Sequence, residues 1–536
     1  MLASLLLITY GVLRTDDRAD PRWLLLLAFV AVLWSVALWP RAPLARTARP
    51  VVHVGLALTV GFGLVAIQIV RAQLLDRERI LARASDPTSG VVDVRRYLGQ
   101  RDAVRGRILM RDGTIVAQDV VGPDGQRRRV YERASAAYLA GYYSPGLFGA
   151  TGIEAAYDDV LSGQAVSNWR TWLDGILHRN RRGNDVVLTI DPELQELGQT
   201  ELADRTGAIV VLDADSGAVL ALVTSPGYDP NRLSVPLGAT REDIERARAY
   251  LRSLEEDGRG PLLLRPVQGL YVPGSTFKTI TAAAAFEFGI AQPDTVYRDD
   301  GALAIDSRVI IEQNRPDPSR VSFTVREAYG YSLNVVFAQI GLQLGSQRLE
   351  AMARAVGFGE AIPFDLPIAP SQIAGTPEFL TSRVGIAETA FGQGQLLVTP
   401  LQMALVTAAV VRDGTVPEPF LVQEVRRPDG SLVESRKPTT WRRAFGQGTA
   451  AQVRDLMIWS VEHGYARNAR IEGAVVGGKT GTAEVGSGAP HAWFVGFGER
   501  DGKRVVVAVV VEHGGSGGQV ALPIARALLE AALAPR

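Results

Sequence analysis

The chain opens with apolar runs that set its first residues apart from the rest. These runs cover Leu2–Leu13, Trp23–Trp39 and Val51–Val70. A transmembrane helix needs about 20 apolar residues, so the third run predicts a full span, the second a shorter span and the first a partial one. A cleaved signal peptide is the alternative, but no small-residue cleavage site follows the third run. We therefore expect residues 1–71 to form a membrane region.

The charges beside these runs predict an orientation. The loop between the second and third runs carries Arg41, Arg46 and Arg49 and no acidic residue. Basic loops stay in the cytoplasm, which places the chain after Val70 outside the cell. The charge difference between the two sides of the third run is modest. Basic residues also follow that run, at Arg71, Arg77, Arg79 and Arg83, and the acidic residues Asp76 and Glu78 offset them only in part.

Residues 72–185 are rich in arginine and glycine and carry short strand patterns. Arg107–Met110 and Thr114–Ala117 flank Asp112-Gly113, a pair that forms tight hairpin turns because it adopts positive φ readily. Further on, Asp191-Pro192 predicts a helix start, with aspartate as the N-cap and proline at the first helical position. We place a domain boundary just before this point, between residues 185 and 186.

The remaining block, residues 186–536, alternates helix and strand patterns. Ala208–Leu212 and Ala218–Thr224 are apolar strands that predict a hairpin. Arg504–Glu512 is a continuous β-branched run, as expected of a central strand buried on both faces. Leu522–Leu533 predicts a closing helix rich in alanine and leucine. The expected fold is a mixed α/β (α+β) domain with a central antiparallel sheet flanked by helices.

Composition excludes several kinds of chemistry. Basic and acidic residues balance at 57 each, so nothing points to nucleic acid as a partner. There is no cysteine, which excludes disulfides and thiolate sites, and the five histidines form no ligand-like cluster. Only four basic residues are lysine: Lys278, Lys437, Lys479 and Lys503. A general preference for arginine over lysine explains why the surface carries so few lysines. Arginine does not titrate, however, so chemistry that needs a neutral amine must keep lysine.

The first candidate motif is Ser275-Thr-Phe-Lys278. Pro273-Gly274 breaks the preceding chain, and Thr276–Phe288 then predicts a mostly apolar, buried helix whose first turn reaches a sheet edge. Residues three apart share one helix face, so the amine of Lys278 should lie near the Ser275 hydroxyl and, if desolvated, could accept its proton. The alternative is a serine N-cap followed by a solvated lysine, because Ser-x-x-Lys is a weak pattern by itself.

The second motif is Ser332-Leu-Asn334, in a predicted turn between two helices. Thr324-Val-Arg-Glu327 has the form of a capping box, so a helix should start there and end near Gly330, before the next helix at Val335–Leu344. The Ser332 hydroxyl could relay a proton, and the Asn334 amide could hold a peptide group. Capping of the following helix is the alternative for both side chains.

The third motif is Lys479-Thr480-Gly481-Thr482. A phosphate-binding loop is excluded because no helix pattern follows, and His491–Phe497 instead predicts a strand hairpin. On an edge strand, the amine and hydroxyls suit a carboxylate, and Gly481 would let a ligand backbone approach closely. An exposed edge lysine that discourages aggregation is the alternative.

Taken together in this order, the three motifs resemble those of penicillin-binding proteins and serine β-lactamases. The chain is most similar to the class B penicillin-binding proteins, which are monofunctional D,D-transpeptidases. Three further parts of the chain are similar to this family. Arg105–Ala117 is similar to the pedestal signature, and Tyr142–Ser144 with Gly149–Asp159 to actinobacterial elongation-type members. Phe391–Gln395 with Thr399–Ala404 is similar to the helix lead-in between the second and third motifs. The resemblance covers residues 51–536.

The resemblance implies roles for each residue. Ser275 would attack the penultimate D-alanine of a stem peptide while Lys278 takes its proton, and the N–H groups of Ser275 and Thr482 would form the oxyanion hole. Ser332, linked to Lys278 and Lys479, would return a proton to the departing D-alanine. The other motif residues would bind substrate: Asn334 the stem peptide, and Lys479, Thr480 and Thr482 the terminal carboxylate that β-lactams mimic. Gly481 would let the ligand backbone come close. No cofactor is implied.

The resemblance also implies an architecture and partners. Residues 72–185 would be an elongated pedestal or dimerisation-like domain, and 186–536 the transpeptidase domain outside the cell membrane. Substrates would be stem peptides of lipid II or nascent glycan, with β-lactams as inhibitors and a polytopic membrane glycan polymerase (SEDS type) as partner. Family members usually have one transmembrane helix, so the extra N-terminal runs depart from the pattern.

Two other functions share these motifs. A class D-like β-lactamase would be far shorter and would lack residues 72–185. A β-lactam sensor or inactive scaffold would bind without turnover, although the His-Glu-x-x-His pattern of known sensors is missing. A bifunctional enzyme is disfavoured because residues 72–185 are too few for a glycosyltransferase domain. The roles in elongation, division or sporulation, and the acceptor diamino acid, stay open.

Overall fold

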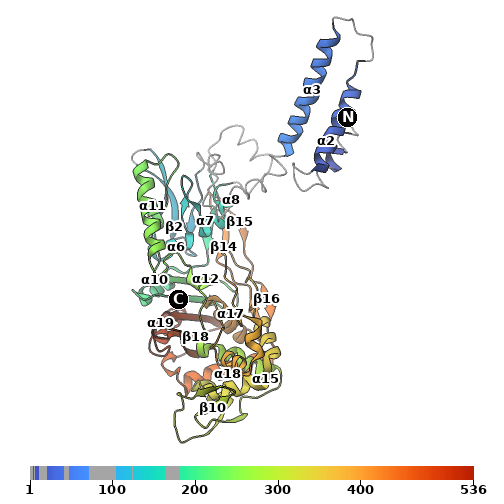
Figure 1. Ribbon diagram of the computed structural model, residues 1–536. Helices are drawn as coiled ribbons and strands as arrows, with labels where there is room; N and C mark the ends of the chain where they lie inside the picture. The colour runs from blue at the N-terminus through green and yellow to red at the C-terminus, as the bar shows by residue number, and fades with distance from the viewer. Residues whose placement is uncertain are drawn as a thin grey trace. The chain divides into compact units, whose positions relative to one another are not determined.

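The computed structural model describes residues 4, 7–10, 21–40, 48–71, 104–122, 125–163 and 182–535. The chain divides into two compact units, Met1–Gly99 and Gln100–Arg536. Each is described by itself (Figure 1).

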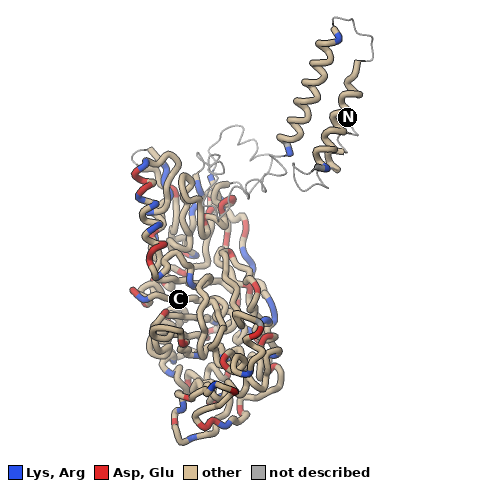
Figure 2. Tube along the Cα trace, viewed as in Figure 1, with Lys and Arg blue, Asp and Glu red and all other residues tan. Residues whose placement is uncertain are grey.

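The first unit contains two packed helices, α2 (Pro21–Ala37) and α3 (Arg49–Val70). The indole N–H of Trp23 on α2 donates to Oε1 of Gln68 on α3 at 2.9 Å. Arginines lie at the two ends of α3, Arg49 as its first residue and Arg71 directly after its last, and Figure 2 shows no lysine or arginine between them. Residues Arg49–Ile69 are long and apolar enough to cross a membrane, whereas the apolar part of α2 is shorter. Most of the first predicted run, Leu2–Leu13, lies outside the described residues.

The second unit is built around a five-stranded antiparallel sheet in the order β17-β18-β19-β7-β8. The predicted hairpin and the predicted central strand are confirmed, because β19 lies in the middle of this sheet and its last seven residues, from Val505 to Val511, are buried. β17 is an edge strand. The strands are β7 (Gly207–Asp213), β8 (Val219–Ser225), β17 (Val475–Ala483), β18 (His491–Arg500) and β19 (Lys503–Val511).

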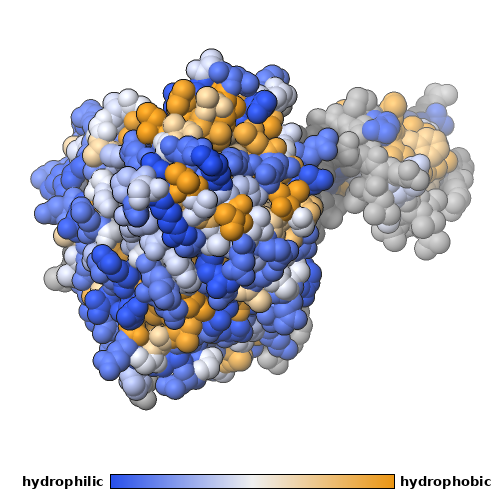
Figure 3. Space-filling view, turned by 90° about the horizontal axis from the view of Figure 1, so that it is seen from below, coloured by the Kyte–Doolittle hydropathy of each residue, from blue (hydrophilic) through white to orange (hydrophobic). Residues whose placement is uncertain are grey.

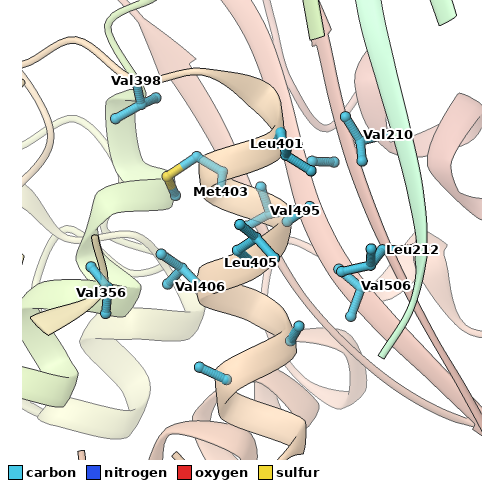
Figure 4. Close-up of a cluster of buried hydrophobic side chains, with 14 of the residues drawn as sticks. Val210, Leu212, Val356, Val398, Leu401, Met403, Leu405, Val406, Val495 and Val506 are labelled. Atoms are coloured by element: carbon cyan, nitrogen blue, oxygen red, sulfur yellow. The ribbon is translucent and has the colours of Figure 1, made fainter. Parts of the chain in front are cut away.

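Helices cover both faces of this sheet, as predicted. One face packs on α10 (Pro192–Leu202) and α19 (Ala521–Ala532), and the other on α17 (Pro400–Val411). Side chains alternate between the faces. Ile209 and Val211 therefore join the core under α19, and Val210 and Leu212 face Leu401 and Leu405 of α17 and its neighbours (Figure 4). The predicted cap is confirmed, since Asp191 accepts from the backbone at the start of α10.

A helical layer continues from the α17 face and carries two of the predicted motifs. Its helices are α12 (Arg265–Gln268), α13 (Lys278–Glu287), α14 (Val325–Gly330), α15 (Asn334–Ala355), α16 (Arg383–Ala390) and α18 (Gln447–Glu462). The predicted capping box is present at the start of α14. The helix predicted at Val335–Leu344 is the first part of α15, which changes direction at Gly345, where φ is +72°. Three two-stranded antiparallel sheets accompany these helices: β9 (Val296–Arg298) with β12 (Ser322–Thr324), β10 (Ala302–Ile305) with β11 (Arg308–Ile311), and β13 (Thr415–Pro417) with β16 (Thr440–Arg443).

A second sheet joins strands from both sides of the predicted boundary at residue 185. Its order is β15-β14-β6-β1-β2-β3, and the hairpin at Asp112-Gly113 is confirmed by the pairing of Leu109 with Ile115. The strands are β1 (Ile108–Leu109), β2 (Ile115–Val121), β3 (Arg127–Tyr131), β6 (Asp185–Leu188), β14 (Val422–Arg426) and β15 (Leu432–Ser435). Beside them lie α6 (Ala134–Ala140), β4 (Tyr143–Ser144), β5 (Gly149–Ala150), α7 (Gly152–Ala156), α8 (Asp158–Leu161) and α11 (Arg241–Glu256).

Seen from the end that carries β10, the surface is mostly hydrophilic with separate hydrophobic patches (Figure 3). β11 pairs with β10, and its side chains Val309 and Ile311 are apolar and exposed. They alternate with Ile310, which is buried, so the ribbon has one face on the protein and one in solvent.

A buried ion network holds the region beside the second sheet together. Glu154 accepts from Arg105 at 2.5 Å and from Arg129 at 2.6 Å, while Arg105 also contacts Asp158 and Arg129 also contacts Asp119. Glu154 is fully buried. The two guanidinium groups hold the pKa of its carboxyl below the ordinary value although burial alone would raise it. The network is therefore charged and depends on its central carboxylate.

Replacing Glu154 by alanine should leave two guanidinium groups buried with their central partner missing. We expect this variant to lower the free energy of unfolding by about 3–5 kcal/mol. Denaturation of the purified full chain measures it. The matched control is Glu245→Ala, which removes a solvent-exposed partner of Arg248 on α11 and should change stability by less than about 0.5 kcal/mol. Equal losses in both variants would contradict the account.

Candidate active site

Ser275 lies in a tight turn against the edge strand β17. The turn is the 3-10 helix Gly274–Phe277, and the α-helix predicted from Thr276 begins only at Lys278. Gly274 has φ of +56°, and a Cβ on it would lie 2.7 Å from the carbonyl oxygen of Thr482. A Cβ on Gly392 would lie 1.7 Å from the carbonyl oxygen of Gly274. Backbone packed on two sides therefore holds the turn, which is why regular helix starts later than predicted.

Lys278 begins α13, and the prediction that this helix is buried is confirmed. Its amine donates to the carbonyl oxygen of Ser332 at 2.7 Å and to Oδ1 of Asn334 at 2.8 Å. It makes no hydrogen bond to Ser275, although the structure describes both residues. Burial lowers the pKa of Lys278 to about 7, against the opposing charge of Glu312. A neutral amine is thus accessible near neutral pH.

Ser332 lies in the turn between α14 and α15, as predicted, and its hydroxyl contacts both lysines of the motifs. Nζ of Lys479 is 2.9 Å from Oγ and Nζ of Lys278 is 3.4 Å from it. The residue has φ of +61°, a conformation that costs a non-glycine residue about 1–3 kcal/mol. The turn thereby places one hydroxyl between two amines.

Lys479 lies on β17 and is 1 % exposed, so the alternative of a solvated edge lysine is wrong. Besides Ser332 it donates to the carbonyl oxygen of Thr480 at 2.9 Å. Burial, together with the charge of Lys278, holds the pKa of Lys479 well below its ordinary value. Two like charges this deeply buried are unfavourable, so the pair favours states with at least one neutral amine.

The free edge of β17 presents backbone groups to the cleft. The carbonyl of Thr482 faces away from β18, because it accepts from Gln393 at 3.5 Å and a Cβ on Gly274 would lie 2.7 Å from its oxygen. Thr480, two residues earlier on the same strand, faces the same way. In an antiparallel ladder the N–H and C=O of one residue point the same way. The N–H groups of both threonines therefore point off the edge, where an extended peptide can pair with them.

Gly481 faces the protein and not a ligand. A Cβ on it would lie 2.9 Å from Cγ2 of Thr276 and 3.0 Å from the carbonyl oxygen of Pro273. The glycine therefore lets β17 approach the turn that carries Ser275. The motif residue was predicted, but the physical reason for it is this close approach.

Two residues near Ser332 were missed by sequence reasoning. Glu312, 8 % exposed, accepts from the backbone N–H groups of Gln313, Asn314 and Val335. The side chain of Asn314 donates to the carbonyl oxygen of Ser332 at 3.1 Å. No spacing in the sequence identifies them, because the contacts that matter at Ser332 and Val335 are to backbone groups 18 and 23 residues away.

The motif residues surround one open cleft of about 940 Å³. Its walls come from the Ser275 turn, the Ser332 turn, β11, β17, the loop after α16, the segment after α18 and the loop after β19. The residues that line it include Ser275, Arg308, Ser332, Asn334, Glu388, Arg467, Thr480, Thr482, Glu484 and Ser516. Within the described residues, no group of three or more histidine, aspartate or glutamate side chains could hold a metal ion.

The arrangement is suited to acyl transfer at Ser275. A partly exposed hydroxyl lies on a cleft wall, a chain of amine, hydroxyl and amine lies behind it, and backbone N–H groups line the adjacent strand edge. Such a chain can accept and return a proton without a metal or a histidine. The geometry is thus suited to acyl transfer by a serine and a lysine.

Comparison with known proteins agrees with this class of site. Residues 207–530 match the penicillin binding protein transpeptidase domain, and residues 105–186 match the penicillin binding protein A dimerisation domain. The peptidoglycan D,D-transpeptidase PbpA of Mycolicibacterium smegmatis is 34 % identical over 84 % of this chain and 92 % of its own. The chain belongs to the penicillin-binding protein transpeptidase family.

Solved structures share the fold. Penicillin-binding protein A from Mycobacterium tuberculosis, as a ceftriaxone acyl-enzyme complex, superimposes with a TM-score of 0.73 at 30 % identity, covering 82 % of this chain and 100 % of that one. The D,D-transpeptidase domain of an Eggerthella lenta peptidoglycan glycosyltransferase gives 0.70 at 33 % identity, covering 81 % and 98 %. The expected mixed α/β transpeptidase fold is confirmed.

Substituting Gly392 by alanine should displace the Ser275 turn, because the new Cβ would overlap the carbonyl oxygen of Gly274. Displacing a reacting group by about 1 Å can cost about a hundredfold in rate, and we expect acylation by penicillin to slow on that order. Stopped-flow labelling measures the rate constant. Gly430→Ala is the control, since its φ of +85° is similar and no atom lies within 4 Å of its Cβ. If Gly392→Ala acylates at the rate of this control, the packing argument fails.

Proposed function

We propose that the chain is a peptidoglycan D,D-transpeptidase that crosslinks stem peptides through an acyl-enzyme on Ser275, with release of D-alanine, and that it binds penicillin covalently at the same serine. The observation that carries this proposal is the buried chain Lys278–Ser332–Lys479 beside a partly exposed Ser275. The names of its relatives, which include D,D-transpeptidases, support it.

In the first half-reaction, Oγ of Ser275 attacks the carbonyl carbon of the penultimate D-alanine and the neutral amine of Lys278 takes the hydroxyl proton. The N–H groups of Ser275 and Thr482 stabilise the oxyanion. The peptide bond then breaks, and a proton passes through the Ser332 hydroxyl to the leaving amine, so that D-alanine departs and an ester remains on Ser275. The amide N–H groups of Asn334 hold the stem peptide, while its oxygen accepts from Lys278.

In the second half-reaction, the amine of another stem peptide attacks the ester, loses its proton to the same amine–hydroxyl chain, and releases Ser275 as the crosslink forms. A β-lactam opens on Ser275 in the same way but leaves no departing group, so its acyl-enzyme persists. Thr480, Gly481 and Thr482 form the strand edge on which either ligand lies, and Lys479 supports the proton chain from behind.

We further propose the arrangement around the membrane. The exposed apolar surface of α3 and its length suit a membrane anchor, and α2 suits a shorter accompanying segment. Residues 72–185 then form the pedestal and 186–536 the catalytic domain outside the cell, divisions supported by the family matches at residues 105–186 and 207–530. A polytopic glycan polymerase of the SEDS type is the proposed membrane partner, supplying nascent glycan as substrate.

Substituting Ser275 by alanine should abolish labelling by fluorescent penicillin, because no other group forms the ester. Gel fluorescence of the purified full chain measures this, with Ser253→Ala on the exposed helix α11 as the matched control that stays labelled. In the wild type the adduct should survive a chase with unlabelled penicillin. Rapid loss of label would indicate a β-lactamase, and labelling of Ser275→Ala would contradict the assignment.

Acylation by penicillin should speed up as pH rises through about 7, because Lys278 acts only when its amine is neutral. The charge of Glu312 raises the pKa of Lys278, so Glu312→Gln should move the midpoint of the rate profile to lower pH. The rate constant, measured across about pH 5 to 9, gives the midpoint. Glu484→Gln, a cleft glutamate that does not act on Lys278, is the control. If Glu312→Gln does not change the midpoint of the profile of rate against pH, Lys278 is not the base that titrates.

A further inference from the structure

The cleft holds a cation that the proposed mechanism does not use. Two arginines and two glutamates line it. Arg308 is paired with Glu388 at 3.3 Å. Arg467 is exposed and, within the part of the chain that the structure describes, forms no salt bridge. A positive charge is therefore available to a ligand in this cleft.

The segment that carries Arg467 is fixed in place. It is the short 3-10 helix Arg467–Ala469 after α18, and Ala466 and Ala469 beside it are fully buried in the core. The preceding Tyr465 donates its backbone N–H to the carbonyl of Gly330 at 3.0 Å and its hydroxyl to the carbonyl of Asn314 at 2.7 Å. The backbone at Arg467 is thus tied to the turn that carries Ser332.

This segment lies beside Thr480. A Cβ on Gly518 would lie 3.8 Å from Cγ2 of Thr480, 3.9 Å from Oγ of Ser516 and 3.9 Å from the carbonyl oxygen of Tyr465. Thr480, Ser516 and the chain leading to Arg467 therefore gather around one glycine on the cleft wall. Thr480, Ser516 and Arg467 all line this cleft, and hydroxyl and guanidinium donors in one cleft are suited to an anion.

Lys479 is poorly placed to serve that anion directly. Its side chain is 1 % exposed, and its amine is occupied by Ser332 and by the carbonyl of Thr480. Burial also disfavours its charged form. A carboxylate in the cleft would thus find its charged partner elsewhere.

The direction of a bound peptide brings its terminal carboxylate to Thr480. With the scissile carbonyl between Ser275 and the N–H of Thr482, a peptide antiparallel to β17 continues toward lower residue numbers. It advances about 3.3 Å for each residue. The residue after the scissile bond therefore lies level with Gly481 and Thr480, on the side of Arg467.

We propose that Arg467 is a specificity-determining residue that binds the C-terminal carboxylate of the donor peptide, and the carboxylate of a β-lactam, beside Thr480 and Ser516. This inference rests on the proposed function, because it assumes acylation at Ser275. It assigns Lys479 to proton transfer and Arg467 to recognition of charge. Because Arg467 is exposed, its attraction for the carboxylate weakens as salt is added.

The test compares benzylpenicillin with its methyl ester, which differs only in lacking the negative charge. For the wild type, the acylation rate constant with the acid should exceed that with the ester. In Arg467→Ala we expect the acid's rate constant to fall about tenfold or more, while the ester's changes by less than about twofold. Arg467→Lys should keep part of the preference.

The matched control is Arg470→Ala, which removes an exposed arginine three residues away whose side chain contacts the carbonyl of Glu462 and does not line the cleft. It should keep the wild-type preference for the acid. An equal fall for acid and ester in Arg467→Ala, or no fall for either, would overturn the role of Arg467 while acylation still occurs. Absence of acylation in the wild type would instead overturn the proposed function itself.

Discussion

The site depends on two lysine amines buried around one hydroxyl. Lys278 and Lys479 both contact Oγ of Ser332, and no carboxylate forms a salt bridge with either amine among the described residues. Desolvation then favours neutral amines, and mutual repulsion strengthens that preference. The buried helix α13, the positive φ of Ser332 and the edge position of β17 all serve to hold these three groups together.

Buried cations outside the site are paired with a carboxylate, unlike the two lysines. Arg105 and Arg129 are also buried, yet each pairs with the carboxylate of Glu154 and stays charged. Arginine cannot release its proton in a protein, so it suits a permanent ion pair and not proton transfer. The chain uses arginine almost everywhere, and two of its four lysines lie at the positions where the proposed mechanism requires a neutral amine.

Local patterns predicted much of the fold and the motif residues. The hairpin at Asp112-Gly113, the capped start of α10, the capping box before α14 and the apolar run of β19 all act through neighbouring residues, so the sequence alone revealed them. Contacts between distant segments were not predictable in this way. The 3-10 turn at Ser275 is held by Gly392 and Thr482, and Glu312 acts on the start of α15. Neither set of contacts produces a periodic pattern in the sequence.

The account's central claim is that Lys278 is a neutral amine near pH 7. Because the chain has only four lysines, NMR of the full protein with lysine labelled at Cε and Nζ can follow each amine, with Lys→Arg variants assigning the signals. The account predicts that Lys278 titrates near pH 7 and that Lys479 titrates well below the ordinary lysine range. Titration of both amines at about pH 10.4, the value of a solvated lysine, would contradict it.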